Sequence, residues 1–356
     1  MNNFSHLLLQ WYQQHQRNLP WRNQTDPYKI WISEIILQQT RVEQGKEYYL
    51  RFIQRFPDVM SLASAQEDEV LKYWQGLGYY TRARNLHSGA KYIADRFNGK
   101  IPADYDDILK IKGVGNYTAA AIASIAFNLP YAAIDGNAYR VLSRVFDVNL
   151  PVDSQKGKIF FAELAQQVLD TRHAGSFNQA MMDFGSLQCK PVNMDCENCC
   201  MANICLANKN HTQHSLPIKQ KSIQIKKRFF YYLCICQDDH IYLQKRLPKD
   251  IWAGLYEFPL IESETELSWE QIMNTPYFSH VLSHCLFTLE HISPVYKHQL
   301  THRLVMGQFF YIKLHQGAPQ WPPEVQTISK DLLFSYPISR LMETGLGNMP
   351  SFHTDQ

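Results

Sequence analysis

The sequence predicts a mainly helical domain followed by an α+β domain, and three observations support this fold class. Up to about residue 207, apolar residues recur mostly at helical spacing, as in IWISEIILQQT, AAAIASIAF and AYRVLSRVF. A polar stretch, NKNHTQHSLPIKQKSIQIKKR, then lacks any sustained apolar period. Beyond it, FFYYLCICQ, HIYLQKR and MGQFFYIKL are β-branched and aromatic runs typical of strands, with one helix expected near SWEQIMN.

The 356 residues are enough for two or three domains with cores of their own. We place a helical region at 1–210, a basic linker at 211–228 and an α+β region at 229–356. The linker is assigned because it carries five basic residues, Lys219, Lys221, Lys226, Lys227 and Arg228.

Composition restricts the class of protein. The first residues do not resemble a signal peptide, and no segment reaches about 18 uninterrupted apolar residues. We therefore expect a soluble, cytoplasmic protein without a membrane partner. The formal net charge is only +2, so a nucleic-acid partner requires basic residues that are concentrated locally.

The first functional candidate along the chain is Glu34, within YKIWISEIILQQT. On a helix its face is shared with Ile30 and Trp31 one turn before and with Leu37 one turn after. Desolvation raises the pKa of a carboxyl group, which would keep Glu34 available as a proton donor near neutral pH. The alternative is a surface glutamate on an amphipathic helix.

The segment DILKIKGVGNYTAAAIASIAF predicts two helices joined by a tight glycine turn. Gly113 and Gly115, on either side of Val114, permit backbone amides to approach a phosphate at the start of the second helix. This is the pattern of a helix-hairpin-helix DNA contact. A plain glycine turn between packed helices is the alternative.

Asp135 stands where the helix of AAIDGNAYRVLSRVF begins, as an N-cap residue. Backbone amides and the helix dipole favour a charged carboxylate at this position, so we expect Asp135 to stay ionised. One carboxyl group poised to give a proton and one fixed as an anion is the division of labour that breaks glycosidic bonds.

Five of the eight cysteines fall between residues 189 and 205, which favours a metal site over disulfides. Four of them have the spacing C-x6-C-x2-C-x5-C, which lets four thiolates converge on one compact metal centre. Structural zinc is the alternative, although zinc sites usually combine two close ligand pairs. Cys200 is a spare thiol or an alternative ligand, and we expect the cysteines beyond residue 230 to be core residues. The four proposed ligands are Cys189, Cys196, Cys199 and Cys205.

Over nearly its whole length the chain resembles the bacterial-type MutY adenine glycosylases of the endonuclease III superfamily. The matching motifs are LPWR, PYKIWISEIILQQTRV, WQGLGYYTRARNL, IKGVGNYTAAAI, AIDGNAYRVLSR, FNQAMMDFG and the cysteine loop. The resemblance implies a helix-hairpin-helix glycosylase domain with one 4Fe-4S cluster, followed by a Nudix-like domain. It also implies removal of adenine opposite 8-oxoguanine or guanine in double-stranded DNA, by a monomer associated with the bacterial nucleoid.

The resemblance assigns roles to individual residues. Glu34 would protonate adenine, Asp135 would stabilise the sugar cation, and Tyr117 and Asn137 would line the reacting centre. Five positions would surround the extruded adenine: Arg17, Trp21, Arg22, Leu37 and Gln179.

Further positions would contact the DNA around the extruded base. Gln39 and Leu77 would fill the opened duplex, with Thr40 beside them, and Tyr79 would stack next to 8-oxoguanine. Ordinary helix packing is the alternative for each of these side chains. The hairpin residues would contribute amides at the phosphate, and they are Gly113, Val114 and Gly115.

The second half, with KRLPKDIWAGLYEFPLIE, resembles the family's Nudix-related domain but lacks the R-E-x-x-E-E motif of active Nudix enzymes. We therefore interpret it as a binding module. KHQLTHRL aligns imperfectly with the family's F-S-H lesion-reading loop and places Leu300, Thr301 and His302 there. The literal F-S-H at 278–280 is interpreted as a chance match.

Two other functions share part of this pattern. Endonuclease III uses the same hairpin, aspartate and cluster, but it carries a nucleophilic lysine where this chain has Tyr117. Without that amine, Schiff-base chemistry has no evident nucleophile, and we expect little or no lyase activity. A non-catalytic DNA-binding protein is disfavoured because Glu34 and Asp135 both lie in complete motifs.

Overall fold

The computed structural model describes residues 2–220, 225–248 and 250–347. The chain forms two compact units, of which unit 1 comprises Met1–Ser64 with Asn85–Ser222, and unit 2 comprises Ala65–Arg84 with Ile223–Gln356. The short segment 65–84 therefore groups with the second half of the chain. Among the described residues, none of the helices has both the length and the apolar character needed to cross a bilayer.

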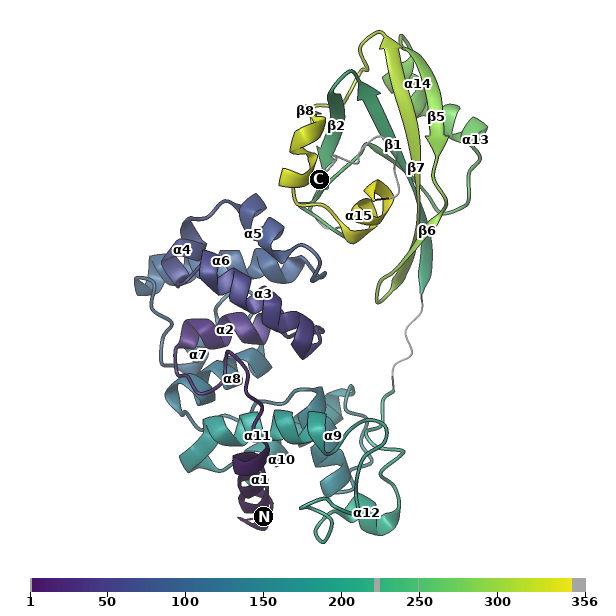
Figure 1. The fold of residues 1–356 in the computed structure, drawn as a ribbon. Coiled ribbons are helices and arrows are strands. Elements are labelled where there is room, and N and C mark those ends of the chain that lie inside the picture. The colour runs from purple at the N-terminus through teal and green to yellow at the C-terminus, as the bar shows by residue number, and fades with distance from the viewer. Residues whose placement is uncertain (1, 221–224, 249, 348–356) are drawn as a thin grey trace. The chain divides into compact units, whose positions relative to one another are not determined.

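Unit 1 is helical, as predicted (Figure 1). Its elements are α1 (Asn2–His15), α2 (Pro27–Ile36), α3 (Val42–Arg55), α4 (Val59–Ser64), α6 (Thr81–Phe97, which begins in unit 2), α7 (Tyr105–Leu109), α8 (Asn116–Phe127), α9 (Gly136–Val145), α10 (Gln155–Val168), η1 (Thr171–His173), α11 (Ala174–Leu187) and α12 (Leu206–Asn210).

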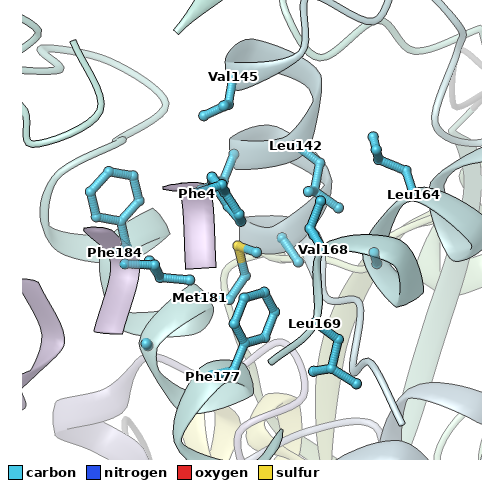
Figure 2. Packing of buried hydrophobic residues seen from close by; sticks show 14 of the residues in the cluster. Phe4, Leu142, Val145, Leu164, Val168, Leu169, Phe177, Met181 and Phe184 are labelled. Atoms are coloured by element: carbon cyan, nitrogen blue, oxygen red, sulfur yellow. The ribbon is translucent and has the colours of Figure 1, made fainter. Parts of the chain in front are cut away.

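One apolar cluster of unit 1 joins helices that are far apart in the sequence (Figure 2). Phe4 of α1 packs against Phe177 of α11, with ring centroids 6.2 Å apart. Leu142 of α9 and Leu164 of α10 complete the same cluster. Because burial of large apolar side chains stabilises the folded state, this cluster fixes α9 and α11, which carry candidate site residues.

A close approach in unit 1 places α2 beside the hairpin that precedes α8. A Cβ atom on Gly89 of α6 would lie 3.0 Å from Cζ2 of Trp31 and 3.1 Å from the carbonyl oxygen of Lys112. Trp31 of α2 is fully buried at this point. A larger residue at position 89 would therefore force α6 away from α2 and the hairpin.

Unit 2 contains an eight-stranded sheet that includes every predicted strand (Figure 1). Its main path is β3-β2-β1-β7-β5, with β1 and β7 parallel and the other pairs antiparallel. The strands are β1 (Lys226–Gln237), β2 (His240–Lys245), β3 (Tyr256–Glu257), β4 (Leu260–Ser263), β5 (Leu286–Ile292), β6 (Tyr296–Gln299), β7 (Arg303–Gln316) and β8 (Val325–Ser329). The helices are α5 (Glu67–Trp74), α13 (Trp269–Met273), α14 (Pro276–Leu282), η2 (Lys330–Ser335) and α15 (Arg340–Leu346).

Helices cover both faces of this sheet. Phe310 of β7 packs in one cluster with Trp269 of α13 and Phe278 of α14. On the opposite face, a Cβ atom on Gly345 of α15 would lie 2.3 Å from Phe309, so only glycine permits this approach. The alternation of Phe309 and Phe310 between the two faces follows from the strand period of two.

Two local expectations were wrong. Lys226, Lys227 and Arg228 were assigned to the linker, but they begin β1 and pair with Arg303 and the two residues after it on β7. The apolar pattern starts only at residue 229, so the sequence does not reveal this pairing. Helix α14 was also not predicted, because its seven residues are too few for a clear period.

The segment that precedes α6 is fixed to the second half of the chain by polar contacts within unit 2. Asp68 on α5 accepts from Lys245 Nζ at 2.5 Å and from the hydroxyl of Tyr256 at 2.9 Å. Lys72 Nζ donates to the carbonyl oxygen of Phe334 at 2.6 Å. These contacts join residues more than 170 positions apart in the sequence, and no local pattern predicts them.

Candidate active site

Glu34 lies on α2, and the sequence determines that helix locally. Asp26 is its N-cap and accepts from the backbone N–H of Tyr28, and Pro27 occupies the first helical position. The rest of α2 is almost entirely buried, and Glu34 itself is only 6% exposed. Burial raises the pKa of Glu34, as predicted, and this favours the protonated carboxyl group.

Tyr117 reaches Glu34 from the first turn of α8. Its hydroxyl group donates to Glu34 Oε2 at 2.5 Å. Burial also raises the pKa of Tyr117, so the phenol keeps its proton. This hydrogen bond favours the charged form of Glu34 and partly offsets the effect of burial on the Glu34 pKa.

Asp135 is the N-cap of α9, as predicted, and both of its carboxylate oxygens are engaged. Oδ1 accepts from the backbone N–H of Ala138 at 2.8 Å, and Oδ2 accepts from Nδ2 of Asn137 at 2.7 Å. Arg140 Nη2 in turn donates to Oδ1 of Asn137 at 2.7 Å. These contacts fix the carboxylate with little freedom to rotate.

The capping hydrogen bonds lower the pKa of Asp135, as expected, but they are not the only influence on it. Burial raises its pKa above the usual value, and the hydrogen bonds from Ala138 and Asn137, together with the positive charge of Arg140, oppose that shift without cancelling it. The repulsion between the charges of Asp135 and Glu34 raises the pKa of Glu34 further. The structure therefore couples the two acidic groups.

All five residues assigned to the adenine pocket are buried or half-buried in unit 1. Trp21 is 4% exposed and packs edge-on against Tyr49, with ring centroids 5.3 Å apart. Arg22 and Gln179 are each 8% exposed, and Arg17 is half-buried. The fifth residue, Leu37, is half-buried at the end of α2.

Sequence reasoning missed two residues of this cluster. Asp183 of α11 is fully buried and accepts from Arg17 Nη2 at 2.6 Å and from Arg22 Nη2 at 2.9 Å. Tyr12 of α1 donates its hydroxyl proton to Oε1 of Gln179 at 2.9 Å. The available signal was an acidic residue in the apolar helix FNQAMMDFG, the same signal that pointed to Glu34.

The predicted hairpin is present between α7 and α8. Gly113 has φ of +82°, and a Cβ atom there would lie 2.6 Å from Cβ of Asn85, so both conformation and space require glycine. Val114 is buried, and Gly115 is exposed as the N-cap of α8. Beyond the end of α2, Gln39 is exposed with φ of +60°, and Thr40 is half-buried.

The four predicted ligand cysteines line one pocket next to α9. Arg144 of α9 donates to Sγ of Cys189 at 3.5 Å, and Arg140 donates to the carbonyl oxygen of Cys189 at 2.8 Å. No three His, Cys, Asp or Glu side chains among the described residues are grouped closely enough to hold a single metal ion. The cysteine loop is thus attached directly to the helix that Asp135 caps.

Unit 2 brings the predicted lesion-reading residues together. The loop of Leu300, Thr301 and His302 joins β6 to β7, and its ends are closed by a hydrogen bond from the N–H of Leu300 to the carbonyl oxygen of Arg303 at 2.8 Å. The hydroxyl groups of Tyr79 and Thr301 lie 2.5 Å apart.

These residues line a pocket of about 630 Å³ within unit 2. Tyr79 is 48% exposed with φ of +48°, and His302 is also exposed. Leu77 lines the same pocket but is only 8% exposed, so its predicted wedge role would require it to leave this packing.

Comparisons with known proteins agree with this architecture. Residues 32–159 match the model of the HhH-GPD superfamily base excision DNA repair proteins, and residues 230–346 match the NUDIX domain model. The chain is 37% identical over 304 residues to an adenine DNA glycosylase of Buchnera aphidicola subsp. Baizongia pistaciae, which covers 82% of this chain and 85% of the relative. The chain belongs to the adenine DNA glycosylase family.

Other members of the family and solved structures extend the likeness. The human adenine DNA glycosylase is 38% identical over 218 residues, covering 59% of this chain and 40% of the human protein. A thermostable thymine-DNA glycosylase structure is 29% identical with a TM-score of 0.54, covering 58% of this chain and 96% of its own. A trapped endonuclease III–DNA covalent intermediate, at 20% identity and a TM-score of 0.51, covers 58% of this chain and 94% of its own, and it shares the fold.

Proposed function

We propose that this protein hydrolyses the N-glycosidic bond of adenine that faces 8-oxoguanine or guanine in double-stranded DNA. The observation that carries the proposal is the buried carboxyl group of Glu34, hydrogen-bonded to Tyr117 and coupled to the capped carboxylate of Asp135. Two acidic groups with different surroundings can act as the proton donor and the anion of a glycosidic cleavage.

In the proposed reaction Glu34 gives its proton to the leaving adenine as the bond to C1′ of the sugar breaks. The electron pair of that bond leaves with the base, and a positive charge develops on the sugar. Asp135 stabilises this charge, and water adds to C1′ and loses a proton, which leaves an abasic site. Tyr117 and Asn137 hold the two carboxyl groups in place.

Adenine must leave the duplex to reach Glu34, at a cost of a few kcal/mol for unstacking and unpairing. The proposed pocket can offset this cost through Arg22 and Gln179. Nε of Arg22 is buried and has no hydrogen-bond partner among the described residues. Tyr12 occupies Oε1 of Gln179, which leaves the amide nitrogen to donate to the base. We assign packing against the ring to Trp21 and Leu37.

We assign the remaining contacts to the DNA backbone and the opened duplex. Gly115 is the N-cap of α8, where the helix dipole favours a phosphate, and we assign the phosphate contact to the hairpin of Gly113, Val114 and Gly115. Gln39, with Thr40 beside it, and Leu77 would fill the space that adenine leaves.

The protein should release free adenine and leave the DNA strand intact, because Tyr117 occupies the position of the lyase lysine and supplies no amine. With a duplex carrying adenine opposite 8-oxoguanine, strand breaks should appear only after heat or alkali. Borohydride should trap almost no enzyme on the DNA. Efficient trapping that a single lysine substitution abolishes would contradict this assignment.

We propose further that Cys189, Cys196, Cys199 and Cys205 hold a 4Fe-4S cluster. The cluster itself would serve as a cross-link that holds the loop closed. The ligand spacing favours it over zinc, because zinc sites usually combine two close ligand pairs and here only Cys196 and Cys199 are close in the sequence. Arg140 connects the loop to Asn137, so the cluster would support the reacting centre from a distance.

Purified protein should be brown and contain about four irons per chain. Cys200→Ser is expected to leave the iron content unchanged, whereas Cys189→Ser should lower it together with adenine release, because the loop that Arg140 contacts is no longer closed. Iron and zinc analysis of anaerobically prepared protein tests this. Stoichiometric zinc without iron absorbance would refute the cluster.

Recognition of 8-oxoguanine is assigned to the loop of unit 2. The hydroxyl group of Thr301 can donate and accept hydrogen bonds, and that of Tyr79 lies 2.5 Å from it. Tyr79 exposes its ring for stacking, and His302 is exposed beside them for a base or a phosphate. Leu300 takes the place of the family's phenylalanine, so an aromatic contact is missing.

The double variant Thr301→Ala with His302→Ala should lose preference for 8-oxoguanine over guanine by about 1 to 3 kcal/mol, the value of one good base contact. Adenine release itself should persist, because the reacting centre lies in unit 1. Rates on matched duplexes measure the preference.

Ser279→Ala with His280→Ala is the matched control, since it removes the same side-chain types from the exposed surface of α14. Phe278 beside them is buried in the core, which agrees with the interpretation of this F-S-H as a chance match. If the control variant loses the preference and the Thr301 and His302 variant keeps it, the residues that recognise 8-oxoguanine lie on α14.

A further inference from the structure

Asp183 on α11 is a fully buried carboxylate that serves two arginines of the proposed adenine pocket. It accepts from Arg17 Nε at 2.9 Å and Nη2 at 2.6 Å, and from the backbone N–H of Arg17 at 3.3 Å. It also accepts from Arg22 Nη2 at 2.9 Å. Hydrogen bonds between charged groups are short and strong, so one side chain fixes both guanidinium groups.

The cluster carries two positive charges and one negative charge. The Arg22 side chain is 5% exposed, so water screens its charge poorly. The positive charge of Arg22 interacts with Glu34 and lowers the pKa of Glu34. Tyr12, which belongs to the same cluster, has a pKa raised to about 12 by burial, so it adds no charge to the cluster near neutral pH.

We propose that Asp183 is a positioning residue for adenine release, which holds Arg17 and Arg22 in place and cancels one of their two positive charges beside the reacting centre. The inference rests on the proposed function, because it concerns the pocket and the proton donor of that reaction. It assigns no contact between Asp183 and the base. Asp183 influences the reaction through Arg22, whose charge affects the pKa of Glu34.

The charged and titratable groups that face Glu34 come from three elements. They are Tyr117 of α8, Asp135 at the start of α9 and Arg22 before α2. If Asp183 loses its charge, the uncompensated arginines favour the ionised form of Glu34 and lower its pKa. Because the donor must be protonated to react, the rate then falls at a lower pH than in the wild-type protein.

Asp183→Asn tests the proposal in single-turnover adenine release across pH. The alkaline fall of the rate should move to lower pH, because the uncompensated positive charge favours the ionised form of Glu34. Tyr12→Phe is the matched control, because it breaks the hydrogen bond to Gln179 in the same cluster without altering its charge. It should lower the rate while the pH dependence stays that of the wild type.

Asp183→Asn leaves two arginines without their buried anion. If this variant does not fold, Arg17→Gln tests the proposal instead. The Arg17 side chain is 24% exposed, and Asp183 keeps its bond to Arg22 in that variant. Removal of a positive charge should move the alkaline fall to higher pH.

An unchanged pH dependence in the variant that folds, or the same shift in Tyr12→Phe, overturns the proposal. A wild-type protein that releases no adenine would instead overturn the proposed function itself. The two failures are therefore distinguished by the wild-type measurement.

Discussion

Glu34→Gln is expected to lower the rate of adenine release by about 10² to 10⁴-fold, the usual contribution of a general acid. Glutamine keeps the size of the side chain and can still accept the hydrogen bond from Tyr117, but it carries no transferable proton. Binding to lesion DNA should be retained. Single-turnover kinetics with a separate DNA-binding measurement would show both results.

Tyr117→Phe provides the comparison for this variant. It removes the hydrogen bond that favours the charged form of Glu34, so the pKa of Glu34 should rise and the carboxyl group should keep its proton. The loss of rate should be much smaller than in Glu34→Gln. Near-normal release by Glu34→Gln would exclude Glu34 as the proton donor.

Asp135→Asn is expected to slow adenine release by about 10² to 10³-fold, the typical effect of removing one electrostatic partner of a transition state. Asparagine is also a good N-cap, so α9 should begin normally. The amide, however, carries no negative charge to offset the developing cation on the sugar. The measurement is single-turnover release at saturating enzyme.

Asn137→Ala separates the charge of Asp135 from its orientation. That variant removes the donor to Oδ2 but leaves the carboxylate and its bond from Ala138, so a smaller loss of rate is expected. If Asp135→Asn stays within about tenfold of the wild-type rate, about 1.4 kcal/mol of barrier, the proposed electrostatic role is wrong.

The sequence predicted the parts of the site that depend on local pattern. Glu34 stands out as a charge within an apolar helix, and Asp135 as a cap before the apolar period of α9. Asp183 gave the same signal, but its partner Arg17 lies 166 residues away, and no pattern in either segment links the two. Buried polar partners of this kind appear only when the helices are packed.

The direction of the pKa shift of Asp135 could not be predicted from the sequence. Its capping partners are local and visible in the sequence, whereas its burial depends on how the surrounding chain packs. The burial raises the pKa by more than the donors lower it. The direction of this pKa shift can therefore be found only from the packed structure.

The segment 65–84 changes how the second half of the chain can be tested. Because Glu34, Asp135 and the cysteine loop all precede the linker in the sequence, truncation after about Lys226 would be expected to remove only lesion recognition. In the structure, Asp68 and Lys72 of α5 are bonded to residues beyond that point. Truncation would therefore also remove these contacts of α5, and the loop variant at Thr301 and His302 is the cleaner test.

Adenine release with a preference for 8-oxoguanine in the opposite strand is tested most directly by single-turnover base release from three duplexes. These duplexes differ only in the base opposite adenine. We expect free adenine as the product, with fast release opposite 8-oxoguanine, slower release opposite guanine and almost none opposite thymine. Release of a different base, or equal rates from all three duplexes, would contradict the account.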